Sequence, residues 1–295
     1  MIYIHFIVNP ISGKGNNTLC LSRLKKILPE AEFNLEVTYT QYKKHAILLT
    51  QNILRYKPDY IIACGGDGTI NEIASSLVGT TTILGIIPMG SGNGLAAHLN
   101  IPKDIEKAIE IIKRGNQISI DLGKANDRYF FSSMGIGVDS LIIKKYEKSA
   151  LRMRKAYAIA AFKAILQFKA RNYVLFLDKE TIQINPYLFF ISNTNEMGYK
   201  LTLTPKANLE DGWLDLIIVP ELSLLQRILL LGYLFAHKIE HYKKAKHLLI
   251  QNLVIEMPEV QNIEAQIDGE IYPTKTNTLT VSIVKKGLSV IVNGN

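Results

Sequence analysis

Cysteine is scarce in this 295-residue chain, which contains only Cys20 and Cys64. The two residues lie far apart, and Cys64 stands inside an apolar run, so we do not expect a disulfide framework. We interpret both as structural thiols in a reducing compartment. The opening MIYIHFIVNP also lacks the charged start and the long apolar core of a secretory signal. These two absences favour a cytoplasmic protein.

Long apolar runs are absent as well. The longest, at 222–236, is interrupted by Gln226 and Arg227. A membrane-spanning helix needs roughly 20 apolar residues, so we expect none here. The chain has no internal repeat or low-complexity linker, and its 47% hydrophobic and 20% charged residues are ordinary for a folded protein. Its length favours two domains.

Acidic residues are outnumbered by basic ones, 26 against 34, which gives a formal net charge of +8. The excess gathers in short clusters at 43–44, 144–145, 152–155 and 243–246. Such a surface attracts polyanions. Aromatic residues do not interleave with the clusters in a nucleic-acid-binding pattern, so we expect no nucleic acid partner. A solubilising surface, an anionic membrane and a phosphorylated ligand stay open as explanations.

The first 121 residues alternate short apolar runs with longer periodic segments. The runs predict strands at Ile2–Val8, Glu36–Tyr39, Tyr60–Cys64, Thr82–Ile87 and Ile118–Leu122. The periodic segments predict helices at Asn17–Leu28, His45–Arg55, Ile70–Leu77 and Ile105–Arg114. This alternation is typical of an α/β domain with a parallel sheet covered on both faces.

After Asp121 the pattern changes to apolar runs that are separated mainly by turns. Strands are predicted at Tyr129–Ser133, Tyr173–Leu177, Tyr187–Ser192, Leu214–Val219, Leu253–Met257 and Leu279–Val284. Only two helical patterns interrupt them, near 150–170 and 221–248. We therefore predict a second, β-rich sandwich domain at 122–295, and leave open a return of the extreme C-terminus to the first domain.

Three glycine-rich loops follow predicted strands of the first domain. They are NPISGKG at 9–15, GGDGT at 65–69 and PMGSGNG at 88–94. Glycine permits left-handed backbone and close approach, and the N-terminal N–H groups of a following helix favour an anion. Ligands bind beyond the carboxyl ends of parallel strands, so the three loops together predict a phosphate cradle.

Asp67 is the one carboxylate in these loops. A carboxylate among phosphates is repulsive unless a divalent cation lies between them, so Asp67 predicts Mg²⁺ together with a nucleotide. The familiar nucleotide templates do not explain the site. The chain has neither G-x-x-x-x-G-K-[ST] nor a G-x-G-x-x-G after a strand.

With these motifs the sequence resembles the diacylglycerol kinase catalytic-domain family, which includes sphingosine and ceramide kinases and bacterial lipid kinases. The resemblance rests on NPISGKG at 9–15, GGDGTINE at 65–72, PMGSGNGLA at 88–96, DLGKANDRYFFSSMGIGVD at 121–139, PKANLEDGWLDL at 205–216 and DGE at 268–270. It implies a phosphofructokinase-like and NAD kinase-like nucleotide domain, a C-terminal β-sandwich domain, and ATP- and Mg²⁺-dependent phosphorylation of a lipid hydroxyl in phospholipid metabolism.

The resemblance also implies roles for single residues. Glu270 matches the family's general base, and Asp67 organises the metal and the phosphates. Nucleotide-binding residues are expected at Asn9, Pro10, Ser12, Gly13, Thr40, Gly65, Gly66, Asp67, Gly68, Thr69, Ile70, Asn71, Glu72, Ser91 and Asn93. Metal contacts are expected at Asp67, Asp121, Asp211 and Asp268.

The chemistry is compatible with the assignment of Glu270. A lipid hydroxyl is a poor nucleophile, so a positioned carboxylate that accepts its proton supplies much of what phosphoryl transfer needs. Asp268 and Glu270 lie two residues apart, and in a strand both side chains would point to the same face.

Three rival interpretations fit parts of the sequence. NAD kinases share GGDGT and ATP but act on a soluble nucleotide, and a regulatory nucleotide-sensing binder could retain the fold without catalysis. His237 to His241 fits H-x-x-E-H, a zinc-peptidase pattern in which two histidines lie one helical turn apart. The lysines that follow make a poor neighbourhood for Zn²⁺, so a solvated basic helix end is the preferred interpretation.

A lipid acceptor requires contact with a bilayer. Residues 150–171 and 222–246 combine apolar and basic positions at helical spacing, and so predict either helices packed on the sandwich or peripheral contact with an anionic membrane at its inner face. A homodimer is left open.

Overall fold

The computed structural model of the protein describes residues 1–13, 19–147, 154–177, 180–195 and 202–294. The chain divides into two units. Unit 1 comprises Met1–Asp121 and Lys285–Asn295, and unit 2 comprises Leu122–Val284. The chain passes from one unit to the other within strand β5 (Gln117–Ala125) and again within strand β16 (Thr278–Ile291).

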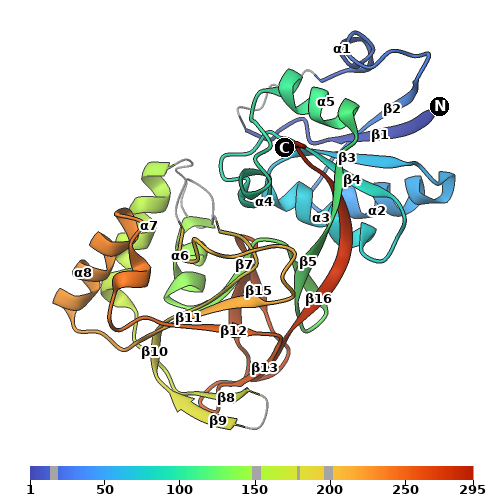
Figure 1. The fold of residues 1–295 in the computed structure, drawn as a ribbon. Helices are drawn as coiled ribbons and strands as arrows, with labels where there is room; N and C mark the ends of the chain where they lie inside the picture. The colour runs from blue at the N-terminus through green and yellow to red at the C-terminus, as the bar shows by residue number, and fades with distance from the viewer. Residues whose placement is uncertain (14–18, 148–153, 178–179, 196–201, 295) are drawn as a thin grey trace. The chain divides into compact units, whose positions relative to one another are not determined.

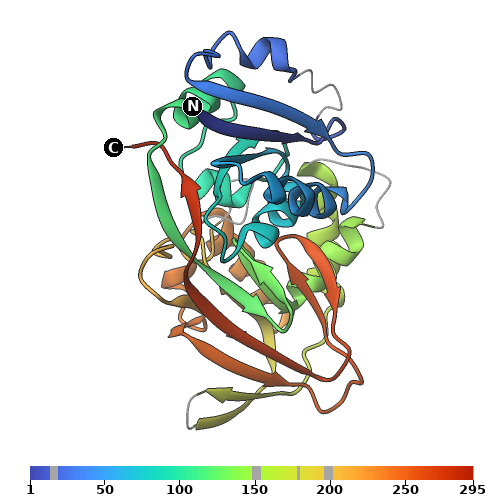
Figure 2. The same cartoon turned by 90° about the vertical axis from the view of Figure 1, so that its right-hand side faces the viewer.

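Unit 1 is built on a parallel sheet in the order β2-β1-β3-β4-β16. Its other strands are β1 (Ile2–Val8), β2 (Phe33–Tyr39), β3 (Tyr60–Gly65) and β4 (Ile83–Pro88). Helices α1 (Leu21–Leu24) and α5 (Ile105–Arg114) lie on one face, and α2 (His45–Ile53) and α3 (Asp67–Leu77) on the other (Figures 1 and 2). Two short helices, η1 (Leu54–Tyr56) and α4 (Gly94–His98), complete the described elements.

Burial on both faces explains the continuous apolar runs of these strands. Ile61, Ile62, Ala63 and Cys64 of β3 are all 0% exposed. A parallel sheet covered by helices on both faces has no solvated side, so its strands do not alternate. The prediction of an N-terminal α/β domain is confirmed.

Helix α5 shows how local signals set the bounds of an element. At its start the Asp104 side chain accepts a hydrogen bond from the Lys107 N–H at 2.9 Å. At its end Gly115 takes up the left-handed conformation, with φ of 68°. These caps satisfy groups that the ends of a helix leave unpaired, and the predicted range is confirmed.

Unit 2 is an antiparallel β-sandwich. One sheet has the order β12-β11-β10-β7-β14-β15, and the other joins β9, β8 and β13 to the first half of β16, with β6 paired to β5. The strands are β6 (Arg128–Phe130), β7 (Ser133–Gly137), β8 (Tyr173–Leu177), β9 (Glu180–Ile184), β10 (Pro186–Ser192), β11 (Leu214–Pro220), β12 (Lys246–Ile250), β13 (Asn252–Glu256), β14 (Glu264–Ile267) and β15 (Glu270–Pro273). The prediction of a C-terminal sandwich is confirmed.

The central strand β10 is buried on both faces. Its Phe189 and Ile191 pack into the core between the two sheets, whereas Leu188 and Phe190 pack beneath helices. Alternate side chains of a strand point to opposite faces, so two apolar layers require the uninterrupted sequence PYLFFIS. The helices of this unit are α6 (Val138–Glu147), α7 (Arg154–Gln167), α8 (Leu224–Phe235) and η2 (Ile239–His241).

Two predicted helices differ from the observed structure, and one observed helix was not predicted. The helix expected at Asn17–Leu28 is reduced to α1, which has no side-chain cap at Cys20, and residues 14–18 lie outside the described part. Helix α6 was not predicted, because its start lies in the glycine-rich GIGVD. The prediction that a helix continues to residue 248 is wrong. The end of that segment forms β12, which pairs with β11, because sheet pairing overrides local periodicity.

Among the helices in the described residues, none combines the length and the apolar character that crossing a membrane would require.

We expect Phe189→Ala to lower the free energy of unfolding by about 3–5 kcal/mol, because it leaves a cavity in the sandwich core. Phe162→Ala is the matched control, since Phe162 is 58% exposed and Phe189 is 0% exposed. A change below about 0.5 kcal/mol is expected for the control. Urea unfolding of both variants measures the difference, and equal losses would contradict the assigned core.

Candidate functional site

The three glycine-rich loops leave neighbouring strands at one edge of the unit 1 sheet. The Asn9 N–H donates to the Cys64 carbonyl at 2.9 Å, and the Asn9 side chain donates to Thr69 Oγ1 at 3.0 Å. The Met89 N–H donates to the Gly65 carbonyl at 2.8 Å. Strand β1 lies between β2 and β3, so the chain leaves β1 and β3 in opposite directions, as at the ligand-binding switch point of open α/β sheets.

The loops approach each other at glycine residues, where no side chain separates their main chains. Gly13 has φ of +67°, and a Cβ atom there would overlap the Met89 carbonyl oxygen. A Cβ atom on Gly90 would lie 2.5 Å from the Gly66 Cα. Real side chains do not tolerate such distances, so glycine is required by packing at these positions and not only by the turns.

Asp67 is the first residue of α3, and its carboxylate is held by the third loop. Oδ2 accepts the Asn93 N–H and Oδ1 accepts the Gly94 N–H, each at 2.8 Å. A Cβ atom on Gly92 would lie 2.7 Å from Oδ2. The carboxylate is therefore at the centre of the loops and only partly buried.

The donor set suits a cation that also binds a ligand. Within the described ranges, no group of three or more His, Cys, Asp and Glu side chains could hold a metal ion. Mg²⁺ bound to one carboxylate usually takes further ligands from phosphate oxygens and water, and Asp67 is compatible with such a site.

The other predicted nucleotide residues of unit 1 surround these loops in several ways. Ser12 Oγ donates to the Asn9 carbonyl at 2.9 Å, and the Thr40 N–H donates to the Val8 carbonyl at 2.9 Å. Glu72 Oε1 accepts the Lys44 N–H at 3.0 Å. Ile70 is 2% exposed, so its side chain belongs to the core. Pro10 and Gly68 are half-buried, and Asn71 Oδ1 accepts a hydrogen bond from Ser75 Oγ. Lys14 and Gly15 of the first loop lie outside the described residues.

Lys103 is a candidate that the motifs did not identify. Its Nζ donates to the Ser91 carbonyl at 3.3 Å, which places a cation beside the third loop. The signal that could have identified it is its position shortly after α4, in IPKD. A lysine is a common partner of phosphate, acting as a point charge.

In unit 2, Asp268 and Gly269 form a two-residue turn, and Glu270 begins β15. The premise that Asp268 and Glu270 share one strand is wrong. The Asp268 carboxylate accepts the N–H groups of residues 131, 132 and 133, each at 2.9 Å. Glu270 is half-buried.

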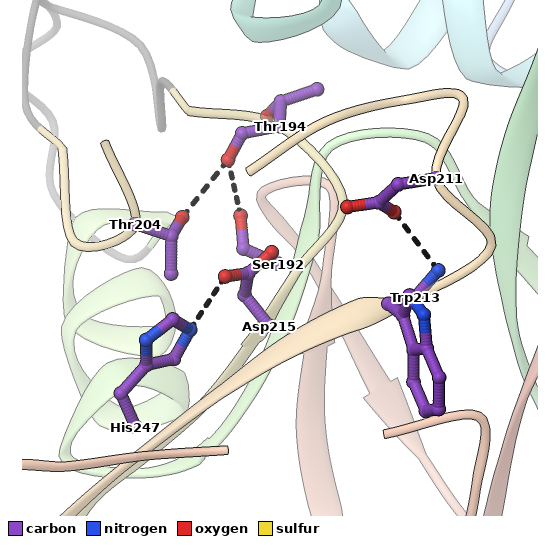
Figure 3. A network of polar contacts seen from close by, with 7 residues as sticks. All are labelled: Ser192, Thr194, Thr204, Asp211, Trp213, Asp215 and His247. Carbon is purple, nitrogen blue, oxygen red and sulfur yellow. Dashed lines mark hydrogen bonds and ion pairs between the residues drawn. The ribbon is translucent and has the colours of Figure 1, made fainter. Parts of the chain in front are cut away.

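Asp211 lies in an exposed turn of unit 2, and its Oδ1 accepts the Trp213 N–H at 3.0 Å (Figure 3). Nearby, the buried Asp215 carboxylate contacts His247 Nε2 at 2.5 Å. Burial raises the pKa of Asp215 and the histidine opposes that rise. Thr194 receives hydrogen bonds on its carbonyl from the Ser192 and Thr204 hydroxyls in the same region (Figure 3).

Asp121 is 1% exposed, and its Oδ1 accepts the Lys286 N–H at 2.7 Å within unit 1.

The zinc interpretation of H-x-x-E-H is not supported. His237 lies after the end of α8 with φ of 54°, and η2 begins only at Ile239, so the two histidines do not share one helix face.

Comparisons with known proteins agree with this architecture. The domain described as "Diacylglycerol kinase catalytic domain" matches residues 3–125, and the one described as "YegS C-terminal NAD kinase beta sandwich-like domain" matches residues 132–292. The fold and these matches define a kinase. The chain belongs to the diacylglycerol kinase family.

Two curated relatives carry the name "Diacylglycerol kinase". The protein of Staphylococcus saprophyticus subsp. saprophyticus is 33% identical over 280 residues, which cover 90% of this chain and 87% of the relative. That of Staphylococcus aureus (strain bovine RF122 / ET3-1) is 31% identical, with 90% and 84% covered.

A solved Bacillus anthracis str. Sterne structure is 25% identical and superposes with a TM-score of 0.80 over 99% of this chain and 97% of that one. A second, titled as a diacylglycerol kinase from the same organism, has a TM-score of 0.73 at 21% identity and 99% and 97% coverage, and therefore shows the fold alone.

We expect Gly13→Ala to lower stability more than Gly79→Ala does. Both glycines have positive φ, at 67° and 75°, but only a Cβ on Gly13 meets another atom within 4 Å. The shared left-handed conformation costs about 1–2 kcal/mol in each variant, so any excess reports the contact with Met89. Thermal unfolding measures this excess, and equal melting temperatures would contradict the close approach.

Proposed function

We propose that this kinase transfers the γ-phosphate of Mg·ATP to a hydroxyl group of a lipid such as diacylglycerol or a sphingoid base. The observation that carries the proposal is the convergence of the three loops on the Asp67 carboxylate at the carboxyl ends of β1, β3 and β4. The lipid acceptor is supported by the names of the curated relatives.

Unit 1 supplies the phosphate site in this proposal. In this proposal Asn9, Ser12, Gly66, Thr69 and Ser91 line the phosphates, although the Asn9 N–H already donates to the Cys64 carbonyl and the Ser12 hydroxyl to the Asn9 carbonyl. Asp67 would hold Mg²⁺, which would neutralise charge on the transferring group. Lys103 adds a positive charge next to Ser91.

Unit 2 supplies Glu270 as the general base. The lipid oxygen forms a bond to the γ-phosphorus while the bond from that phosphorus to the bridging oxygen of ADP breaks, and the hydroxyl proton passes to the Glu270 carboxylate. We also propose Asp211 as the site of a second, structural cation, because it matches a position where members of the family hold a structural Mg²⁺. Metal roles for Asp121 and Asp268 stay predictions, and both carboxylates accept main-chain N–H groups.

We expect Asp67→Ala and Glu270→Gln each to reduce phosphate transfer from labelled ATP to lipids by about 10²–10⁴-fold, because each removes a group that acts on the reacting atoms. Glu264→Gln is the matched control, since Glu264 is an exposed residue of the same hairpin that pairs with Lys144. Thin-layer separation of the labelled products measures transfer. Label in NAD would favour a soluble acceptor, and label in no acceptor would favour a nucleotide-sensing binder.

The lipid acceptor also suggests a membrane-contacting surface on unit 2, which we propose for α7 and α8. The helices are joined by Arg227, whose guanidinium donates to the Ile165 carbonyl at 2.8 Å. Exposed apolar residues on α7 and α8 are Ile159, Phe162, Leu166, Leu224, Leu225, Ile228 and Leu229. Apolar helix faces with neighbouring lysines suit the surface of an anionic bilayer and a peripheral location at its inner face. Arg152 of the basic cluster lies outside the described residues.

We expect Leu225→Gln combined with Leu229→Gln to weaken binding to vesicles of phosphatidylglycerol and phosphatidylcholine, because Leu225 is 80% and Leu229 is 55% exposed. Leu48→Gln, on α2 and 50% exposed, is the matched control. Cosedimentation at low salt measures binding. Unchanged binding of the double variant would contradict the assignment of α8 to the membrane-contacting surface.

A further inference from the structure

The turn before Glu270 is held by hydrogen bonds on both of its residues, one set to a distant segment and one to the neighbouring strand. Strands β14 and β15 pair at Ile267 and Glu270, so only Asp268 and Gly269 connect them. Both take up left-handed backbone, with φ of 46° and 83°. Two left-handed residues form a tight turn whose twist matches that of a β-hairpin, and Glu270 follows this turn directly.

Asp268 fixes the turn to the segment 131–133. Its Oδ2 accepts the Phe131 N–H, its Oδ1 accepts the Ser132 and Ser133 N–H groups, and its own N–H donates to the Ser133 carbonyl at 2.8 Å. Hydrogen bonds to an ionised acceptor are stronger than neutral ones. The Asp268 carboxylate therefore links the turn between β14 and β15 to the segment 131–133 by three hydrogen bonds.

The segment 131–133 is itself rigidly placed. The Ser132 carbonyl accepts the Asn193 N–H at 2.8 Å, and the Asn193 side chain donates to the Phe131 carbonyl at 3.1 Å. Phe131 and Asn193 are each 1% exposed. The segment is thus bonded through its carbonyls to residues after β10 and through its N–H groups to Asp268.

Gln266 holds the other end of the turn. Its Oε1 accepts the Gly269 N–H at 2.9 Å, and its side chain lies close enough to the Asp139 carboxylate to oppose the rise of that group's pKa. Both residues are buried, and burial raises the pKa of Asp139 to about 6.

Resting on the proposed function, we propose that Asp268 and Gln266 are positioning residues for Glu270: they hold the turn between β14 and β15 so that the base is presented by a fixed main chain. Neither residue acts on the substrate or on the metal in this proposal. Small displacements of a catalytic group lower the rate strongly, so the loss of either anchor should reduce kcat and leave the KM for ATP unchanged.

A double-mutant cycle tests the proposal in the full-length enzyme. Asp268→Ala and Gln266→Leu should each lower kcat by about 10²-fold in the parent, and by less than about twofold when Glu270 is already Gln, because their effect passes through Glu270. Asp127→Ala is the matched control. It removes a carboxylate that accepts a hydrogen bond from Tyr272 of β15 away from the turn, and should change kcat little.

The same variants separate anchoring from metal binding and from unfolding. The Mg²⁺ concentration for half-maximal rate should stay unchanged in Asp268→Ala, while the N–H groups of residues 131–133 lose protection in hydrogen exchange and the melting transition stays cooperative. A raised Mg²⁺ requirement, or independent multiplicative losses in the Glu270→Gln background, would overturn the positioning role alone. A parent enzyme that phosphorylates no lipid would overturn the proposed function and the positioning role with it.

Discussion

The close approach of main chain to main chain at the carboxyl edge of the unit 1 sheet is the constraint on which the site depends. Gly66 and Gly90 lie against each other, and Gly13 lies against the Met89 carbonyl. A side chain at any of these positions would separate the loops and remove the donors that surround Asp67. The parallel sheet makes the approach possible, because neighbouring parallel strands end at the same edge.

Carboxylates in both units are placed by backbone N–H groups that lie far from them in sequence. Asp67 accepts from residues 93 and 94, Asp121 accepts from residue 286, and Asp268 accepts from residues 131–133. Main-chain donors are held by the fold itself, so they orient a carboxylate without the conformational freedom of a long basic side chain. The same kind of contact is therefore found in the glycine-rich loops of unit 1 and in the hairpin of unit 2.

Much of the fold could be predicted because its signals are local. The strands β1, β8 and β10 follow directly from apolar runs, and α5 from its periodic pattern of apolar residues. Elements whose formation depends on distant partners were missed. Strand β12 forms because β11 offers an edge to pair with, and α6 begins in a glycine-rich segment that packs against β7 and β14. For the candidate site, the loops could be recognised from glycine and hydroxyl residues, while Lys103 and Gln266 carry no motif.

By itself the sequence determined which residues are bare enough to meet a phosphate, where the apolar runs lie, and that the chain resembles the diacylglycerol kinase family. The tertiary structure alone decided that Asp268 stands in a turn and not in a strand, and that its carboxylate binds the N–H groups of a segment up to 137 residues away. The physical reason is that every residue except proline carries a main-chain N–H. Only the folded backbone selects which of these donors reaches a given carboxylate.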